Sequence, residues 1–243
     1  MSLSIDTSNL KAVLFDLGGT LIEYVNNPPL EIFEDFKKRL THNDPPITCI
    51  DFCVMIERYW VTMQDEFYSS GTHQTIADFN QAFLINQGFS YETSFKLATP
   101  FDEIIFQLQL TGTVAIDGAI ALLNHLKEKK YKLGVVTNAS HTESRIRQLM
   151  RHVEIEHFFA TVVISSVVGI QKPDPEIFQI ALNELSINAS QALYIGDRLD
   201  YDAQGAENAG IQFVIISDKI KLKSIMSEII AVQNKPIYKK NSH

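Results

Sequence analysis

Four groups of polar side chains have the residue types of a site that binds a metal ion and a phosphate. They are Asp16, Thr137 with Asn138, Lys172, and Asp197 with Asp200 and Asp202. Carboxylates brought close together repel one another unless a cation lies between them. An all-oxygen ligand set without Cys or His favours Mg²⁺ over zinc. A lysine, a threonine hydroxyl and backbone amides at a helix start suit a phosphate group.

Each group also has an ordinary structural explanation when it is taken alone. Asp16 could cap a turn, Thr137 and Asn138 could lead into a helix, Lys172 could be a solvated charge, and Asp200 and Asp202 could face a helix dipole. Whether the four groups form a metal and phosphate site therefore depends on the sequence pattern around each of them.

The first group is positioned by a short apolar run, residues 12–15, with the length and composition of a buried parallel strand. Asp16 ends this run. Gly18 and Gly19 follow, and they allow the backbone to turn tightly and approach a ligand closely. Open α/β sheets bind ligands at this carboxyl end of their strands.

The other groups belong to a region in which strands and helices alternate. We expect strands at 131–136, 161–165, 192–195 and 211–216, and helices at 117–130, after a capping box at 140–143, from 175, from 202 to a stop at Gly210, and at 222–230. Alternation of this kind predicts an α/β fold with a doubly wound, Rossmann-like parallel sheet. All four polar groups would then face one crevice.

Residues 22–112 have a different, entirely helical pattern. Apolar residues recur at intervals of three and four in the segments 30–40, 49–68, 75–86 and 101–110. Six aromatic residues of this block could line a pocket, but most of them are expected to be ordinary core: Phe33, Phe36, Trp60, Phe67, Phe79 and Phe83. Because the block is too long for a loop, we expect an inserted all-helical domain at 22–112 and an α/β core formed by 1–21 and 113–243.

Composition limits the class of function. The chain has 243 residues, a net charge of −8 and 45% hydrophobic residues, which argues against nucleic acid or an anionic membrane as the main partner. Cys49 and Cys53 are expected to be two packed thiols in a reducing compartment. We see neither a leader nor an apolar run of ~18 residues, and we expect a cytoplasmic protein.

Four segments, in this order, resemble the motifs of the haloacid dehalogenase superfamily of phosphohydrolases: DLGGTL, VVTNAS, QKPDPEIF and YIGDRLDYD. The resemblance covers 11–21 and 113–216, and the block 22–112 stands where that superfamily carries its helical cap. It implies a hydrolase whose cap closes over a small phosphorylated metabolite and selects it. A monomer or a homodimer would be compatible with this.

The resemblance also implies residue roles. Asp16 would be the nucleophile that forms an aspartyl-phosphate. Mg²⁺ would be bound by Asp16, the carbonyl of Gly18 and Asp197, with Asp202 as a further ligand or as a partner of the ligands. The phosphoryl group would be held by Thr137, the amide of Asn138, Lys172 and Gly19. Lys172 would also balance the charge of Asp16.

Gly18 departs from the family pattern. Phosphatases of the superfamily usually carry a second aspartate at this position, which protonates the leaving group and is worth ~10²–10⁴ in rate. Three explanations stay open. Another side chain could supply the proton, with Glu23, Tyr24 and His73 as candidates; the substrate could have a good leaving group, such as an acyl phosphate; or the protein could be a weak or inactive hydrolase.

Two further functions stay open for the same reason. One is a metal-independent 2-haloacid dehalogenase, since those relatives also lack the second aspartate. They carry a bulky aromatic residue there and have largely replaced the metal aspartates, whereas this chain keeps Asp197, Asp200 and Asp202. The other is a non-catalytic protein that binds a phosphorylated metabolite. The sequence therefore favours a Mg²⁺-dependent phosphohydrolase.

Overall fold

The computed structural model describes residues 5–25, 29–63, 75–217 and 221–233. The chain divides into two compact units, each described by itself below. The core unit consists of Met1–Glu23 and Val114–His243, and the helical unit is Tyr24–Thr113. None of the helices in the described residues combines the length and the apolar character needed to cross a membrane.

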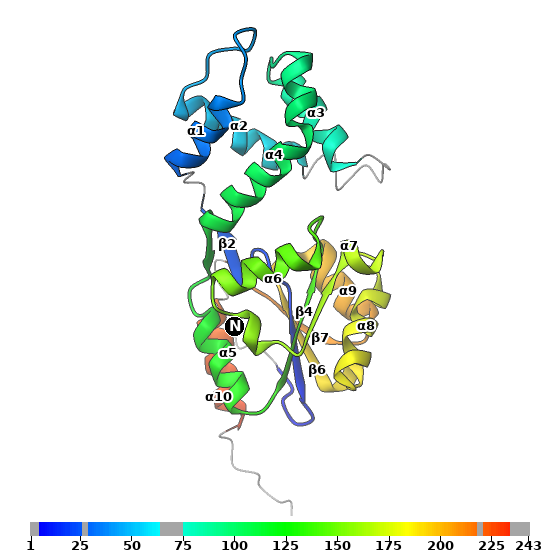
Figure 1. The fold of residues 1–243 in the computed structure, drawn as a ribbon. Helices are drawn as coiled ribbons and strands as arrows, with labels where there is room; N and C mark the ends of the chain where they lie inside the picture. The colour runs from blue at the N-terminus through cyan, green and yellow to red at the C-terminus, as the bar shows by residue number, and fades with distance from the viewer. Residues whose placement is uncertain (1–4, 26–28, 64–74, 218–220, 234–243) are drawn as a thin grey trace, which may run out of the picture. The chain divides into compact units, whose positions relative to one another are not determined.

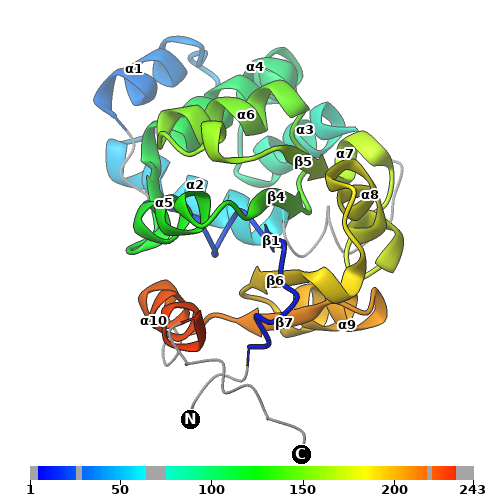
Figure 2. The same ribbon diagram turned by 90° about the horizontal axis from the view of Figure 1, so that it is seen from below.

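The core unit is built on a five-stranded parallel sheet with the order β5-β4-β1-β6-β7 (Figures 1 and 2). The strands are β1 (Ala12–Phe15), β4 (Lys132–Thr137), β5 (Thr161–Ile164), β6 (Ala192–Gly196) and β7 (Gln212–Ile215). In the register of the sheet, Phe15 stands between Val135 and Ile195. The predicted parallel sheet is confirmed, and the carboxyl ends of β1, β4 and β6 lie side by side.

Helices cover both faces of this sheet. They are α5 (Ala119–Glu128), α6 (Glu143–His152), α7 (Ser165–Val168), α8 (Pro175–Leu185), α9 (Gln204–Asn208) and α10 (Leu222–Gln233). Figure 1 shows α5 and α10 on one side of the sheet and α8 and α9 on the other. Ala12 and Leu14 pack with α8, while the ring of Phe15 meets that of Phe159. Burial on both faces explains why β1 reads as a continuous apolar run.

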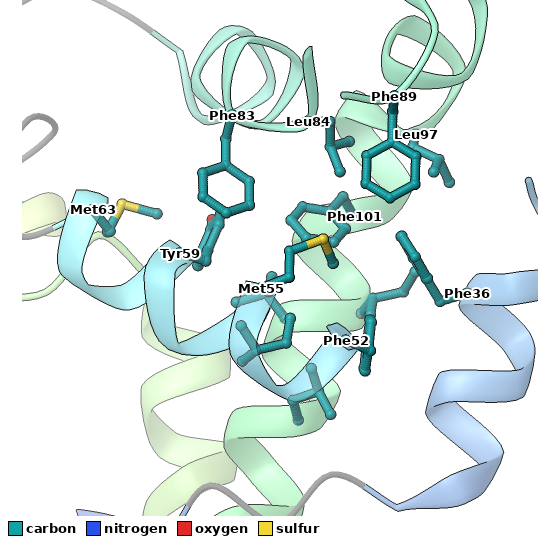
Figure 3. Packing of buried hydrophobic residues seen from close by; sticks show 14 of the residues in the cluster. Phe36, Phe52, Met55, Tyr59, Met63, Phe83, Leu84, Phe89, Leu97 and Phe101 are labelled. Atoms are coloured by element: carbon teal, nitrogen blue, oxygen red, sulfur yellow. The ribbon is translucent and has the colours of Figure 1, made fainter. Parts of the chain in front are cut away.

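The helical unit contains α1 (Leu30–Lys38), α2 (Cys49–Thr62), α3 (Ile76–Asn86) and α4 (Tyr91–Gly112). Their apolar faces meet in one buried cluster, shown close by in Figure 3. The ring centroid of Tyr59 lies 5.1 Å from that of Phe83 and 5.5 Å from that of Phe101. The Tyr59 hydroxyl donates to Asn80 Oδ1 at 2.8 Å, so this buried polar group is satisfied.

The predicted aromatic core of this unit is largely found. Phe33, Phe36, Phe79 and Phe83 belong to the buried cluster, and Trp60 packs against it half-buried. Phe67 lies outside the described residues. Cys49 and Cys53 are free, half-buried thiols on α2.

Several predicted helix starts were wrong. Helix α4 begins at Tyr91 and runs through Pro100, not from residue 101. Asp117 does not cap α5, because Gly118 precedes that helix in a left-handed conformation and the carboxylate pairs with Lys223 Nζ at 2.7 Å. Residues 140–143 form no capping box, since α6 begins at Glu143 and its first turn is capped by Thr142.

A second sheet was not predicted. It has two short strands, β2 (Ile22–Tyr24) and β3 (Thr113–Ala115), placed where the chain passes from one unit to the other. Helix α7 was also missed, and Asp202 lies in a π-helical turn, Leu199–Ala203, that precedes α9. Three- and four-residue elements are too short to show a hydrophobic period.

Candidate active site

Three carboxylates meet at the carboxyl edge of the core sheet. Asp16 follows β1 directly, Asp197 follows β6, and Asp202 returns from the π-helical turn beyond it. Each offers one oxygen, and these oxygens lie within 4.8 Å of one another. Asp202 is fully buried and Asp16 is 7% exposed. The structure thus brings together three of the predicted acidic residues from segments far apart in the chain.

Lys172 lies at the centre of this cluster, just before α8. Its ammonium donates to Asp16 Oδ1 at 2.8 Å, to Asp202 Oδ1 at 2.7 Å and to the Tyr194 hydroxyl at 3.0 Å. An ammonium has three protons, so each has a protein acceptor. The side chain is almost completely buried. The predicted charge balance between Lys172 and Asp16 is therefore present as a direct ion pair.

Asp202 holds the surrounding backbone. Its Oδ1 accepts from Lys172 and from the Tyr194 hydroxyl, and its Oδ2 accepts from the backbone amides of Asp197 and Arg198 at 3.0 and 2.9 Å. Both oxygens are thus engaged by protein donors. This arrangement fixes the loop that carries Asp197 and favours Asp202 as a partner of the ligands over a direct metal ligand.

Asn138 clamps the backbone of Lys172. Its Oδ1 accepts from the Lys172 amide at 2.8 Å and its Nδ2 donates to the Lys172 carbonyl at 3.0 Å. This reciprocal pair ties the end of β4 to the segment before α8. Thr137, the last residue of β4, is buried beside it. Both residues therefore lie at the carboxyl end of β4, next to the carboxyl end of β1 that Asp16 follows.

The glycine turn after Asp16 packs against Asp197. Gly19 has φ +76°, and a Cβ placed there would lie 2.5 Å from Asp197 Oδ2, so only glycine fits both the backbone and the contact. Buried Thr20 donates from Oγ1 to Asp197 Oδ1 at 3.3 Å. A Cβ at Gly18 would have nothing within 4 Å. The position that relatives fill with aspartate is thus open space.

Burial and neighbouring charges shift the pKa values of the site residues in opposite directions. Burial raises the pKa of Asp16 to about 6, against the attraction of the Lys172 ammonium. Burial and the Asp202 carboxylate raise the pKa of Asp197. Burial lowers the pKa of Lys172, but the carboxylates of Asp16 and Asp202 outweigh it and raise that pKa. Lys172 is thus charged, and the acidic groups retain repulsion that a further cation would relieve.

The donor set fits a hard divalent cation. Asp16 and Asp197 offer carboxylate oxygens in the same small region, and no Cys or His belongs to the cluster. Oxygen-only sets of this kind suit Mg²⁺. The coordination of the Gly18 carbonyl stays a prediction.

Other predicted residues do not join the cluster. Asp200 is exposed and pairs with Arg198, whose Nη2 lies 2.9 Å from Asp200 Oδ2. Glu23 is exposed on β2, Tyr24 belongs to the helical unit, and His73 lies outside the described residues. The proton donor that would replace the missing aspartate is therefore not identified among the described residues of the core unit.

Two residues of the site were missed from the sequence, Tyr194 and Thr20. Tyr194 lies in the middle of β6 and is fully buried, and burial raises the pKa of its hydroxyl well above the usual value. A tyrosine inside an otherwise apolar strand needs a partner for its hydroxyl. The need for such a partner could have identified Tyr194 as a candidate site residue from the sequence. Thr20 was within the first motif, but nothing in its spacing indicated a contact with Asp197.

Known proteins resemble this chain in part of its sequence and in its fold. A glyceraldehyde 3-phosphate phosphatase of Pyrococcus abyssi is 38% identical over 99 residues, which cover 41% of this chain and 41% of that relative. A haloacid dehalogenase-type hydrolase of Bacillus subtilis, solved with bound magnesium, is 19% identical with a TM-score of 0.59, covering 88% of this chain and 92% of its own. A protein of Haemophilus somnus, described as a predicted phosphoglycolate phosphatase, is 19% identical with a TM-score of 0.62, covering 94% and 100%.

These comparisons differ in what they show. The chain matches about two fifths of the length of the curated phosphatase, and identities near 19% in the solved structures show the fold alone. The family model is more extensive, since the model of the haloacid dehalogenase-like hydrolases matches residues 13–216. That range contains Asp16, Lys172, Asp197 and Asp202 together with the whole described helical unit. The chain therefore belongs to the haloacid dehalogenase-like hydrolases.

Proposed function

We propose that this protein is a Mg²⁺-dependent phosphohydrolase of small phosphorylated metabolites that acts through Asp16. The single observation that carries the proposal is the buried ion pair of Asp16 with Lys172, 2.8 Å long, inside a cluster of three carboxylates. A nucleophile, a fixed positive charge and a set of oxygen ligands at one point are the parts that phosphoryl transfer requires. The phosphatase activity of the Pyrococcus abyssi relative supports this class of substrate.

The covalent step uses the carboxylate oxygen that does not bind Lys172. Lys172 engages Asp16 Oδ1, so Oδ2 is the atom that attacks phosphorus. The bond from phosphorus to the leaving oxygen breaks, an aspartyl-phosphate forms on Asp16, and the leaving group departs with its electron pair and takes a proton from water to give the free alcohol or phenol. Water then attacks the same phosphorus, which releases inorganic phosphate and restores the carboxylate.

The remaining residues hold the transferring group. Thr137 and the backbone amide of Asn138 would donate to phosphoryl oxygens, and Lys172 keeps the nucleophile paired and oriented. The Gly19 amide donates to the Ile22 carbonyl at 2.8 Å, so Gly19, predicted from the sequence as a phosphate contact, is left out of this set. Mg²⁺, when held by Asp16, Asp197 and the Gly18 carbonyl, would neutralise phosphoryl charge. Asp202 keeps Lys172 and the Asp197 backbone in place.

The helical unit is proposed to be the cap that selects the substrate. It forms its own buried core, and its chain enters and leaves through β2 and β3. A unit with its own buried core can move as a rigid body and close over a site. Substrate choice would then depend on residues of 24–113, separately from the chemistry at Asp16.

A panel of phosphorylated metabolites, with p-nitrophenyl phosphate as a general substrate, tests the proposal. We expect phosphate release that requires Mg²⁺, is abolished by chelation and is lost in Asp16→Asn. The Asp200→Asn variant is the matched control, because that aspartate is exposed and paired with Arg198. The absence of turnover across the panel with Mg²⁺, or full turnover in Asp16→Asn, would contradict it.

A 2-haloacid dehalogenase is the second candidate, favoured by the open position at Gly18. The cluster of Asp16, Asp197 and Asp202 argues against it, since a metal-free reaction has no use for three converging carboxylates, two of them buried. Halide release from 2-haloacids in the presence of a chelator would support the dehalogenase. Stabilisation by phosphorylated ligands without any turnover would instead indicate a binding protein.

A further inference from the structure

Tyr194 carries a hydroxyl group into the most deeply buried part of the site. It lies on β6 and is 0% exposed. Its oxygen lies 3.0 Å from Lys172 Nζ, 2.9 Å from Asp202 Oδ1 and 3.1 Å from the carbonyl oxygen of Val136. No role of Tyr194 is needed for the steps described above, so its presence requires a separate explanation.

The donors and acceptors at this point can be counted. The Tyr194 oxygen accepts one proton of Lys172, and its own proton goes to Asp202 Oδ1 or to the Val136 carbonyl. The carboxylate is the closer and the charged acceptor, which makes it the stronger partner. Lys172 uses its other two protons on Asp16 and Asp202. Tyr194 is thus the third acceptor that fixes the rotation of the ammonium group.

Packing alone does not account for a tyrosine here. The ring meets Phe178 at 5.0 Å in an edge-to-face contact, and a phenylalanine ring would make the same contact. The hydroxyl is the part that differs, and a hydroxyl buried away from water is unfavourable unless it is bonded. It is retained at a position where its partners are the lysine and the aspartate of the site.

We propose that Tyr194 is a positioning residue, whose hydroxyl holds the Lys172 ammonium and Asp202 in the arrangement that keeps Asp16 ready to attack. This inference rests on the proposed function. Without the hydroxyl, the third Lys172 proton loses its acceptor, so the ammonium rotates and the contact with Asp16 Oδ1 loosens. Substrate binding does not involve Tyr194, because the residue is fully buried and its hydroxyl is bonded to protein atoms.

The variant Tyr194→Phe tests this with Mg²⁺ and p-nitrophenyl phosphate. We expect kcat to fall about 10–100-fold, as for other groups that orient residues of metal sites, while KM changes by less than about twofold. The matched control is Tyr59→Phe. It removes another fully buried tyrosine hydroxyl, bonded to Asn80 at 2.8 Å in the core of the helical unit, and it should lower thermal stability without lowering kcat.

A second readout does not depend on turnover. Nζ-labelled lysine in nuclear magnetic resonance reports the buried ammonium, whose three bonded protons exchange slowly with water. The signal of Lys172, identified by its loss in Lys172→Met, should be visible in the wild type and in Tyr59→Phe. It should broaden or disappear in Tyr194→Phe.

The outcomes separate the two claims. Wild-type kcat in Tyr194→Phe, an equal loss of kcat in Tyr59→Phe, or an unchanged Lys172 signal would overturn the positioning role. If the wild type itself shows no turnover, the proposed function fails, and the resonance signal still decides whether Tyr194 fixes Lys172.

Discussion

Gly18 departs from the pattern of the phosphatases that the motifs of this chain resemble. Its backbone does not have a positive φ, and a Cβ there would meet nothing within 4 Å. The position can therefore accept a side chain without a rearrangement of the turn. The fold therefore does not prevent an aspartate at residue 18, and the effect of an acid there on catalysis can be tested directly.

Gly18→Asp should raise turnover of alkyl phosphates, whose leaving groups need a proton, by about tenfold or more. Turnover of p-nitrophenyl phosphate should change less, because its leaving group departs without one. The measurement is a comparison of kcat on the two substrate types. Gly18→Asn is the control of equal size that cannot donate an acid proton. An equal gain in Gly18→Asn, or none in Gly18→Asp, would show that leaving-group protonation is not the missing element.

Gly19, unlike Gly18, has a positive φ and no room for a Cβ. Gly19→Ala would force a Cβ to 2.5 Å from Asp197 Oδ2 and displace that carboxylate, so activity should fall at least about tenfold. Gly88→Ala is the matched control: it has φ +90° and open space around its Cβ position. Both variants should lose about 1–2 kcal/mol of stability from the left-handed backbone, but Gly88→Ala should keep full activity. Comparable activity in the two variants would remove Gly19 from the site.

At the scale of elements, the core strands were predictable because the apolar composition of each run indicates a buried strand. The run at 12–15 is apolar throughout and is followed directly by Asp16, and the run at 192–195, apolar except for Tyr194, is followed by Gly196 and Asp197, so both the strand and the site residue are visible. Helix α4 was harder. Pro100 reads as a break, but Ser90 already caps the helix, and the proline is accommodated inside it. Tertiary packing of α4 against α3 outweighs the local signal.

Asp44 is a polar residue whose role the sequence did not reveal, and its hydrogen bonds to the start of α4 explain it. Asp44 accepts from the Thr93 hydroxyl at 2.5 Å, from the amide of Ser90 at 2.9 Å, and from Thr41. Burial raises the pKa of Asp44, but these hydrogen bonds outweigh it and hold the pKa well below its usual value. One carboxylate thus ties the loop before α2 to the first turn of α4.

Asp44→Ala should destabilise the protein by about 1–3 kcal/mol at neutral pH. Because the folded pKa lies below the unfolded value of about 3.9, the stabilisation is complete above the unfolded pKa, shrinks as pH falls below it and is lost as pH falls through the folded pKa. Urea unfolding of wild type and variant at pH 7 and near pH 3 measures this difference. Asp35→Ala, which removes an exposed ion pair with Arg39, should cost much less at both values. A difference between wild type and Asp44→Ala that does not shrink on acidification would contradict the assignment.

At the scale of the whole molecule, the convergence of the site followed from topology. Parallel strands bring their carboxyl ends to one edge, so Asp16, Thr137 and Asp197 had to lie along the same edge of the sheet. The bonds that lock Lys172 could not be read from the sequence, because they depend on side-chain directions across β4, β6 and the turn before α9. The two-stranded sheet at the unit boundary was also invisible, since three residues give no period.

Mg²⁺ should stabilise the folded protein through the carboxylate cluster. A cation at 100 times its Kd adds about 2–3 kcal/mol to the free energy of unfolding, visible as a rise in Tm on thermal denaturation. Asp197→Asn should lose this rise, because it removes a ligand, while Asp200→Asn should keep it. A rise of equal size in Asp197→Asn would locate the cation elsewhere.

The central claim is that the carboxylate of Asp16 becomes phosphorylated during turnover. The most direct measurement is a rapid quench of the reaction, followed by borohydride reduction, which converts an aspartyl-phosphate to homoserine, and mass spectrometry of the peptide that contains residue 16. We expect homoserine at residue 16 only when substrate and Mg²⁺ are both present, and none in Lys172→Met. Phosphate release with an unmodified Asp16, or homoserine at another aspartate, would contradict the account.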